Sequence, residues 1–347
     1  MNPWDPVTAI RTVSTLLRVG KNLRMRFVDV GGEHLSAIGV GTWQFGSREW
    51  AYGKDYADTT AVDIVHRALD LGVNVIDTAE VYGFGKSERI VGRAIAGRRD
   101  EAFVATKLLP VVPPFVGSYL ASRGRKSAQR LGIEAIDLYQ VHWPNPIVPP
   151  STIADGLRQL QDEGVVRQLG VSNYALDGWR KLEDTLGRPI LANQVQYSLA
   201  VRKPEHELMP YAQANDRLII AYSPLAQGLL GAKYDATNVP KDVRATNPLF
   251  LPENLERAGP LLGALRDIAK SHDATPAQVS LAWLIRRPNV IAIPGASSVS
   301  QLEANVAAAD LELTDDDDAR LTEASDSFSP RRGVGVVPQI IANRLRR

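Results

Sequence analysis

Four side chains that could together transfer a proton stand at or just after three short apolar runs. Asp77 closes the run VNVID, and Tyr82 follows it five positions later. Lys107 closes the run AFVATK, and His142 closes IDLYQVH. A free tyrosine has a pKa of about 10, which is too high for an efficient acid near neutral pH. A nearby ammonium lowers the pKa of a phenol, a carboxylate keeps that ammonium charged, and an imidazole can hydrogen-bond a substrate oxygen.

These residues can act together only if the fold brings separate runs to a common place. Apolar runs recur along the chain, and we expect each to be a strand buried on both faces. The runs span residues 35–41, 73–77, 102–107, 136–142, 166–173, 190–196, 217–223 and 290–295. Helical patterns separate them over residues 59–72, 86–95, 151–164 and 174–187. Alternation of this kind predicts the α/β class: a parallel sheet closed into a single-domain (β/α)8 TIM barrel.

The carboxyl ends of the strands in such a barrel share one rim, and active sites lie on that rim. The four residues above come from three consecutive strands, so we expect them to be neighbours. One polar residue after an apolar strand means little, since it could simply begin a loop. However, polar residues also stand at or near the ends of the following strands, namely Ser172, Asn173, Gln194 and Tyr222. Together they predict an active site on the rim.

Two segments lie outside the repeating pattern. Residues 25–38 predict an extra hairpin that turns at Gly31 and Gly32 and covers the barrel floor. Residues 223–250 form a long interval rich in Gly, Pro and Asn, and a loop of that length in a compact domain is usually functional. We expect three regions in the chain. They are an N-terminal extension that is disordered or a short helix (1–24), the barrel (25–330) and a basic C-terminal tail (331–347).

The overall composition argues against several classes of protein. Among 347 residues, 40 Lys and Arg balance 39 Asp and Glu, so no overall field favours nucleic acid or a membrane. The chain has no cysteine, which excludes disulfides and thiolate metal sites and suits a reducing compartment, so we expect a cytoplasmic protein. No apolar run approaches the roughly 20 residues of a membrane span. The first 26 residues are basic, as transit peptides are, but we expect a simple appendage ahead of the fold.

The motifs around these residues resemble those of the aldo-keto reductases. The matching segments are GTWQFG (41–46), NVIDTAEVYGFGKSE (74–88), ATK (105–107), IDLYQVHWP (136–144), GVSN (170–173), NQVQYS (193–198), AYSPLAQGLL (221–230) and IPGASS (293–298). They stand in the family's order along nearly the whole chain. They look closest to the branch that contains bacterial inositol-operon-type reductases and potassium-channel β subunits.

The resemblance implies an activity and a catalytic tetrad. The family's aspartate, tyrosine, lysine and histidine correspond to Asp77, Tyr82, Lys107 and His142. The implied reaction is NAD(P)H-dependent reduction of an aldehyde or ketone to an alcohol. Tyr82 would donate the proton as the general acid, and His142 would orient the carbonyl oxygen. Trp43 and Trp143, next to family motifs, would line the substrate pocket with Tyr82 and His142, and core packing is the alternative for the two tryptophans.

The resemblance also implies a nicotinamide cofactor, NADPH in the first place and NADH as the alternative. Many relatives carry a lysine and an arginine at the positions of Gly295 and Gln301, so this chain lacks the usual partner of the 2′-phosphate. The implied cofactor contacts are Gly41, Thr42, Trp43, Ser172, Asn173, Gln194, Tyr222, Ser223, Leu225, Gln227, Gly228, Gly295, Ser297, Gln301 and Asn305.

Two other functions stay open on the sequence alone. The similarity to channel β subunits favours an NADPH-binding regulatory subunit with slow or vestigial turnover. Lys107 could instead form a Schiff base, although Asp77 would keep it protonated. The segment GFGKS (83–87) lacks the earlier glycine of a phosphate-binding loop, since Glu80 stands there. We expect a small-molecule carbonyl substrate and neither a metal site nor a nucleic-acid or membrane partner, and the sequence does not predict the oligomeric state.

Overall fold

A computed structural model describes residues 16–19, 23–47, 52–53, 57–110, 116–240 and 242–331. The described strands form a small antiparallel sheet and a large parallel one. The small sheet consists of β1 (Leu16–Val19), β2 (Leu23–Val30) and β3 (Glu33–Ser36). The large sheet consists of β4 (Val40–Gly41), β5 (Val75–Asp77), β6 (Phe103–Leu108), β7 (Ile136–Val141), β8 (Val166–Ser172), β9 (Ala192–Gln196), β10 (Leu218–Tyr222) and β11 (Val290–Ala292).

The large sheet closes into a barrel. Its strands pair in chain order from β4 to β11, and every pair is parallel. The first and last strands then meet, because Gly39 N donates to Ala292 O at 2.7 Å and Gly41 N donates to Pro294 O at 3.1 Å. The predicted (β/α)8 barrel is therefore confirmed. Each of the eight predicted apolar runs overlaps one barrel strand, and the first run, residues 35–41, also includes the end of β3.

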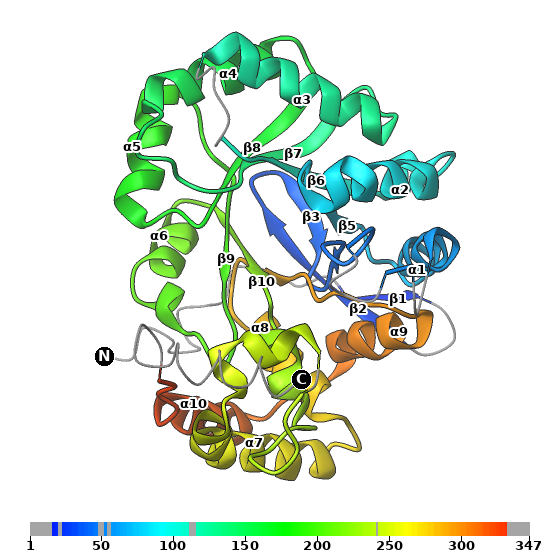
Figure 1. Ribbon diagram of the computed structural model, residues 1–347, viewed down its shortest axis with the longest axis vertical. Coiled ribbons are helices and arrows are strands. Elements are labelled where there is room, and N and C mark those ends of the chain that lie inside the picture. The colour runs from blue at the N-terminus through cyan, green and yellow to red at the C-terminus, as the bar shows by residue number, and fades with distance from the viewer. Residues whose placement is uncertain are drawn as a thin grey trace.

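Helices surround the barrel strands, as Figure 1 shows. The described helices are α1 (Asp58–Asp70), α2 (Lys86–Ile95), α3 (Gly117–Leu131), α4 (Pro150–Asp162), α5 (Leu176–Leu186), α6 (Leu208–Ala214), α7 (Pro252–Ser271), α8 (Pro276–Ile285), α9 (Val299–Val306) and α10 (Asp315–Asp326). The four predicted helices correspond to α1, α2, α4 and α5. Because helices cover the outside, β6 and β7 are buried along their whole length, as expected for parallel strands that are covered on both faces.

The β2–β3 hairpin, blue near the centre of Figure 1, covers the amino-terminal end of the barrel. Gly31 and Gly32 have φ angles of +57° and +81°, the left-handed values that a two-residue hairpin turn requires. Gly31 N donates to the Asp216 carboxylate just before β10, and Gln168 near the start of β8 donates to Glu33. The predicted hairpin at the barrel floor is confirmed.

Part of the expected N-terminal extension takes a different form. Leu16–Val19 is strand β1, which pairs antiparallel with the edge of β2. A short helix is therefore wrong for these four residues, since the edge of β2 supplies their backbone with hydrogen-bond partners. The other residues of the expected extension up to residue 22, and the C-terminal tail after Arg331, lie outside the described residues.

The long interval over residues 223–250 is built from three short 3-10 helices, Ala226–Gly231, Val243–Thr246 and Pro248–Phe250. It follows β10 at the carboxyl-terminal rim and lines the cleft described below. The loop therefore lies where the sequence led us to expect a functional segment, at the wall of the cleft. Within the described part of the chain, no helix has both the length and the apolar character that crossing a membrane requires.

Candidate active site

Three neighbouring strands bring the four predicted proton-transfer residues together. Asp77 is the last residue of β5, and Lys107 lies near the end of the adjacent β6. His142 directly follows β7, and Tyr82 begins the 3-10 turn that connects β5 to α2. Because the strands are parallel and adjacent, all four side chains reach the same sector of the rim.

Lys107 is the centre of this cluster. Its Nζ donates to Asp77 Oδ2 at 2.6 Å and to Thr78 O at 2.8 Å, and it lies 3.5 Å from Tyr82 Oη. Its side chain is 0% exposed and that of Asp77 is 3% exposed, so the ion pair is shielded from water. Burial alone lowers the pKa of Lys107, but Asp77 and Tyr82 raise it, with the net result above its ordinary value. Lys107 is therefore a cation.

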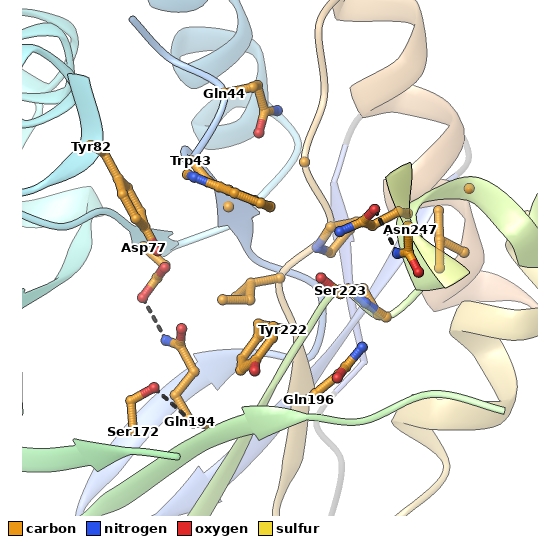
Figure 2. A pocket seen from close by; sticks show the side chains of 18 of the residues that line it. Trp43, Gln44, Asp77, Tyr82, Ser172, Gln194, Gln196, Tyr222, Ser223 and Asn247 are labelled. Atoms are coloured by element: carbon orange, nitrogen blue, oxygen red, sulfur yellow. Dashed lines mark hydrogen bonds between the residues drawn. The ribbon is translucent and has the colours of Figure 1, made fainter. Parts of the chain in front are cut away.

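The second oxygen of Asp77 is held by two amides from inside the barrel. Gln194 Nε2 donates to Asp77 Oδ1 at 2.7 Å, and Gln140 Nε2 approaches the same oxygen at 3.5 Å. Figure 2 shows the Gln194 contact as a dashed line. Gln140 was not predicted from the sequence. Strand alternation could have found it, because residues two apart on β7 share a face and His142 faces the rim.

Burial decides the protonation of Tyr82. Desolvation raises the pKa of the phenol, Lys107 lowers it and Asp77 raises it, so the net pKa is above the ordinary value of 10. The lowered pKa predicted from the sequence is wrong for the structure described here, because desolvation outweighs the lysine charge. At neutral pH the hydroxyl keeps its proton, and this protonated form is the one that can act as a donor.

His142 faces Tyr82 edge to face. The ring centroids are 5.9 Å apart, with an angle of 78° between the ring planes. Burial and the charge of Lys107 lower the pKa of His142 from 6.5 to about 3. The imidazole is therefore neutral at physiological pH. Its Nδ1 is buried without a hydrogen-bond partner among the described residues. His142 also lines the cleft, where a neutral imidazole can hydrogen-bond a ligand without carrying charge.

A long cleft of about 1170 Å³ starts at this cluster and follows the rim. All predicted cofactor-contact residues line it except Thr42 and Asn305. Thr42 is fully buried, where its hydroxyl donates to Asp77 O and contacts Ser87 Oγ. Asn305 Nδ2 donates to Gly295 O at 3.2 Å. Both residues therefore stand behind the lining of the cleft, and their contact with a cofactor stays a prediction.

Amide and hydroxyl groups gather where the cleft passes β8, β9 and β10. Ser172 Oγ donates to Gln194 O at 2.9 Å, and Tyr222 Oη donates to Asn173 Oδ1 at 2.9 Å. Asn173 has a φ of +62°, an uncommon value for a residue other than glycine. Figure 2 shows Ser172, Gln194 and Tyr222 on this part of the wall. The arrangement offers both donors and acceptors to a bound amide.

The far end of the cleft is formed by the loop after β10 and the segment that leads into α9. Gln227 and Gly228 have φ angles of +57° and +95°, so the chain turns there with left-handed backbone. A Cβ atom at Gly295 would lie 2.6 Å from the Gln44 amide, so a side chain there would displace Gln44. Gln301 Oε1 accepts hydrogen bonds from both N and Oγ of Ser297. This end is therefore lined with polar atoms.

Arg244 is a cleft residue that was not predicted from the sequence. It is the one arginine or lysine among the described residues that line the cleft. Its Nη1 would lie 3.4 Å from a Cβ atom at Gly228, and its guanidinium pairs with Asp242. No motif surrounds it in the sequence. The sequence could have pointed to Arg244 only through its position in the long loop. A basic residue in a functional loop of a neutral protein is a candidate for binding an anion.

Aromatic side chains border the cleft beside the cluster around Lys107. Trp43 is 43% exposed and Trp143 is 49% exposed, and both line the cleft with Val81 and Leu109. Neither tryptophan belongs to the core. Figure 2 shows Trp43 across the cleft from Tyr222 and near Tyr82. Within the described residues, no group of acidic, histidine or cysteine side chains could hold a metal ion.

The barrel and its rim define a class of protein: a (β/α)8 barrel that combines a buried lysine–aspartate pair with a phenol and a neutral imidazole. The chain belongs to the aldo/keto reductase family, whose model matches residues 37–326. It is 55% identical over 307 residues to an uncharacterised oxidoreductase of Mycobacterium bovis. The aligned residues cover 88% of this chain and 94% of the relative.

Solved structures agree with this membership. The chain resembles a glycerol dehydrogenase from Gluconobacter oxydans with a TM-score of 0.79 and 31% identity, over 89% of this chain and 97% of that one. It also resembles an aldo-keto reductase from Klebsiella pneumoniae in complex with NADPH, with a TM-score of 0.69 and 29% identity, over 89% and 97% of the two chains. Fold and family are therefore established independently of the site geometry.

Proposed function

We propose that this protein reduces an aldehyde or ketone to an alcohol with NADPH, and that Tyr82 is the general acid. The observation that carries the proposal is the contact set of Lys107, which is bonded to Asp77 at 2.6 Å and lies 3.5 Å from the Tyr82 hydroxyl beside a long cleft. A phenol that must release a proton needs a fixed cation nearby to stabilise the phenolate that is left.

The residues of the cleft fit a dinucleotide of this kind. Ser172, Asn173 and Gln194 supply the donors and acceptors that a nicotinamide carboxamide needs. Arg244 supplies a cation for a phosphate at the wall of the cleft. The complex of the Klebsiella relative with NADPH supports the same cofactor. NADH is the alternative, since Gln301 stands where many relatives carry an arginine.

The protein contributes positioning and proton transfer. When bound, the reduced nicotinamide supplies a hydride to the carbonyl carbon. Tyr82 gives its proton to the carbonyl oxygen, and Lys107 stabilises the phenolate that remains. The neutral imidazole of His142 holds the same oxygen in place. A Schiff base on Lys107 is disfavoured, because this amine is fully buried and Asp77 and Tyr82 raise its pKa.

The proposal is tested by following the absorbance of reduced nicotinamide over many turnovers with a panel of aldehydes and ketones. We expect loss of NADPH in excess of enzyme, with the alcohol as product. Tight NADPH binding without turnover on any carbonyl would instead support the regulatory-subunit alternative. The relationship to the inositol-operon and channel-β branch and the cytoplasmic location both stay predictions.

A further inference from the structure

Glu80 is a buried acid within the catalytic segment that the reaction above does not use. It stands between Asp77 and Tyr82 in the sequence, and its side chain is 10% exposed. It does not line the cleft. An ionised carboxylate at such depth is costly unless it is paired and hydrogen-bonded, so the partners of Glu80 indicate why it is there.

The Glu80 carboxylate connects three elements. Its Oε1 accepts a hydrogen bond from Leu109 N at 2.8 Å, just after β6. Arg123 of α3 donates from Nε to Oε2 at 3.2 Å and from Nη2 to Oε1. The main-chain N of Glu80 also donates to Lys107 O at 3.3 Å. The segment from Asp77 to Tyr82 is therefore tied to β6 by both its backbone and this side chain.

This attachment bears on the distance that the reaction needs. Tyr82 lies on the turn after β5, whereas Lys107 lies on β6, so their separation depends on how the turn is held against that strand. Val81, Tyr82 and Leu109 all line the cleft, which places the Glu80 contacts directly behind the wall beside the phenol. A shift of about 1 Å in a reacting group can cost about 100-fold in rate.

We propose that Glu80 is a positioning residue which, with Arg123, fixes the Tyr82 turn against β6 and so sets the distance from the phenol to Lys107. The inference rests on the proposed reductase function. Arg123 depends on Glu80 for compensation of its charge, because the side chain of Arg123 is 14% exposed and its Nη1 has no partner among the described residues. The two residues therefore act as a pair.

The chain contains a matched pair that serves as a control. Glu88 of α2 is fully buried and pairs with Arg130 of α3, and it also accepts a hydrogen bond from Thr106 Oγ1 at 2.7 Å. Like the first pair, it joins the segment after β5 to α3 and contacts β6. Neither Glu88, Arg130 nor Thr106 lines the cleft. The Glu88 carboxylate lies on α2 and bonds Thr106 and Arg130, whereas Glu80 lies within the Asp77–Tyr82 segment itself. Loss of the Glu88 pair should therefore affect stability without moving Tyr82.

The test compares Glu80→Met with the double variant Glu80→Met/Arg123→Met. The single variant leaves a buried unpaired cation, and the double variant leaves none, so the double variant should recover most of the lost resistance to urea. Nevertheless, we expect its kcat to stay at least about tenfold below wild type, with the Kd for NADPH changed less than about twofold. The control Glu88→Met/Arg130→Met should keep kcat within about twofold of wild type.

A rescue variant separates positioning from charge. Glu80→Gln/Arg123→Met keeps an acceptor for Leu109 N without a charge, and we expect it to restore kcat to within about threefold of wild type. Recovery of kcat in Glu80→Met/Arg123→Met in step with stability would overturn the proposal, as would an equal loss of kcat in the Glu88 control. If the proposed reductase function were wrong, the result would differ, because the wild-type protein would show no multiple turnover with NADPH.

Discussion

Lys107 is the residue on which the chemistry at the rim depends. It is a buried cation that one carboxylate holds in place, and it lies beside a phenol and an imidazole whose protons it influences. Asp77 and Tyr82 raise its pKa, while its charge helps to lower that of His142 to about 3. In the proposed reaction, these opposite shifts would give the three groups different roles: Lys107 would stabilise charge, Tyr82 would carry the proton and His142 would stay neutral.

Replacement of Tyr82 by phenylalanine tests the proton donor. The variant keeps the ring but has no transferable proton, so we expect kcat to fall at least about 100-fold. The Kd for NADPH should stay within about twofold of wild type, since the hydroxyl is assigned to proton transfer and not to binding the cofactor. Steady-state kinetics and a fluorescence titration measure the two quantities. Turnover at the wild-type rate would show that another group is the acid.

The pH dependence of reduction tests the neutral state of His142. Its pKa of about 3 lies far below 6.5, and the pKa of Tyr82 is above its ordinary value. Between about pH 5 and 8 neither group changes protonation, so kcat should be level over this range. At higher pH, kcat should fall as Tyr82 loses its proton. A drop in kcat on acidification through pH 6.5 would mean that His142 titrates normally and would contradict this assignment.

At the scale of the secondary-structure elements, the barrel closes where the short strand β4 meets the segment that follows β11. Gly41 N donates to Pro294 O, and a Cβ atom at Gly41 would lie 2.6 Å from Ile293 O in the backbone after β11. That contact is too close for any residue with a side chain, and the atom in the way is main chain and cannot rotate aside. Glycine at this position is therefore required by the approach of two strands, and not by a turn.

Gly41→Ala should therefore push β4 away from β11. We expect the free energy of unfolding to fall by about 1–3 kcal/mol, measured by urea denaturation. Gly263→Ala is the control, because Gly263 lies in α7 and a Cβ atom there would have no atom within 4 Å. At that position, alanine should be neutral or stabilise by up to about 1 kcal/mol. Equal effects of the two substitutions would argue against close approach as the reason for Gly41.

Across the whole molecule, the cleft joins segments that are far apart in the sequence. Its lining runs from Gly41 at the end of the first barrel strand to Gln301 in α9, and it includes the long loop that carries Arg244. A ligand that fills it contacts residues from most of the barrel strands at once. Ligand binding should therefore stabilise the complete barrel, because these contacts exist only when all the segments are folded together.

This coupling predicts a thermal shift. At a free NADPH concentration of about 100 times its Kd, the folded state should gain about 2.7 kcal/mol, seen as a higher Tm in differential scanning fluorimetry. Arg244→Gln removes the cation that lines the cleft, so the same NADPH concentration should raise Tm less. An equal shift in both proteins would show that Arg244 does not contact the cofactor.

The sequence alone was sufficient for the barrel, the hairpin floor and the grouping of Asp77, Tyr82, Lys107 and His142 at one place on the rim. Strand and helix periods are local properties, and the order of parallel strands then decides which strand ends become neighbours. Asp77, Lys107 and His142 could therefore be grouped from their positions along the chain. Their assignment to a tetrad also drew on motifs that resemble a known family.

Only the tertiary structure decided the features that depend on packing between distant segments. The raised pKa of Tyr82 results from the depth of its burial, and the contact of Gln194 with Asp77 joins side chains 117 positions apart. Arg244 had no motif to mark it. Glu80 stands inside the motif of residues 74–88, but its contact with Arg123 of α3 exists only once that helix packs beside the rim. Local patterns specify which elements form, whereas desolvation and long-range contacts exist only once those elements are assembled.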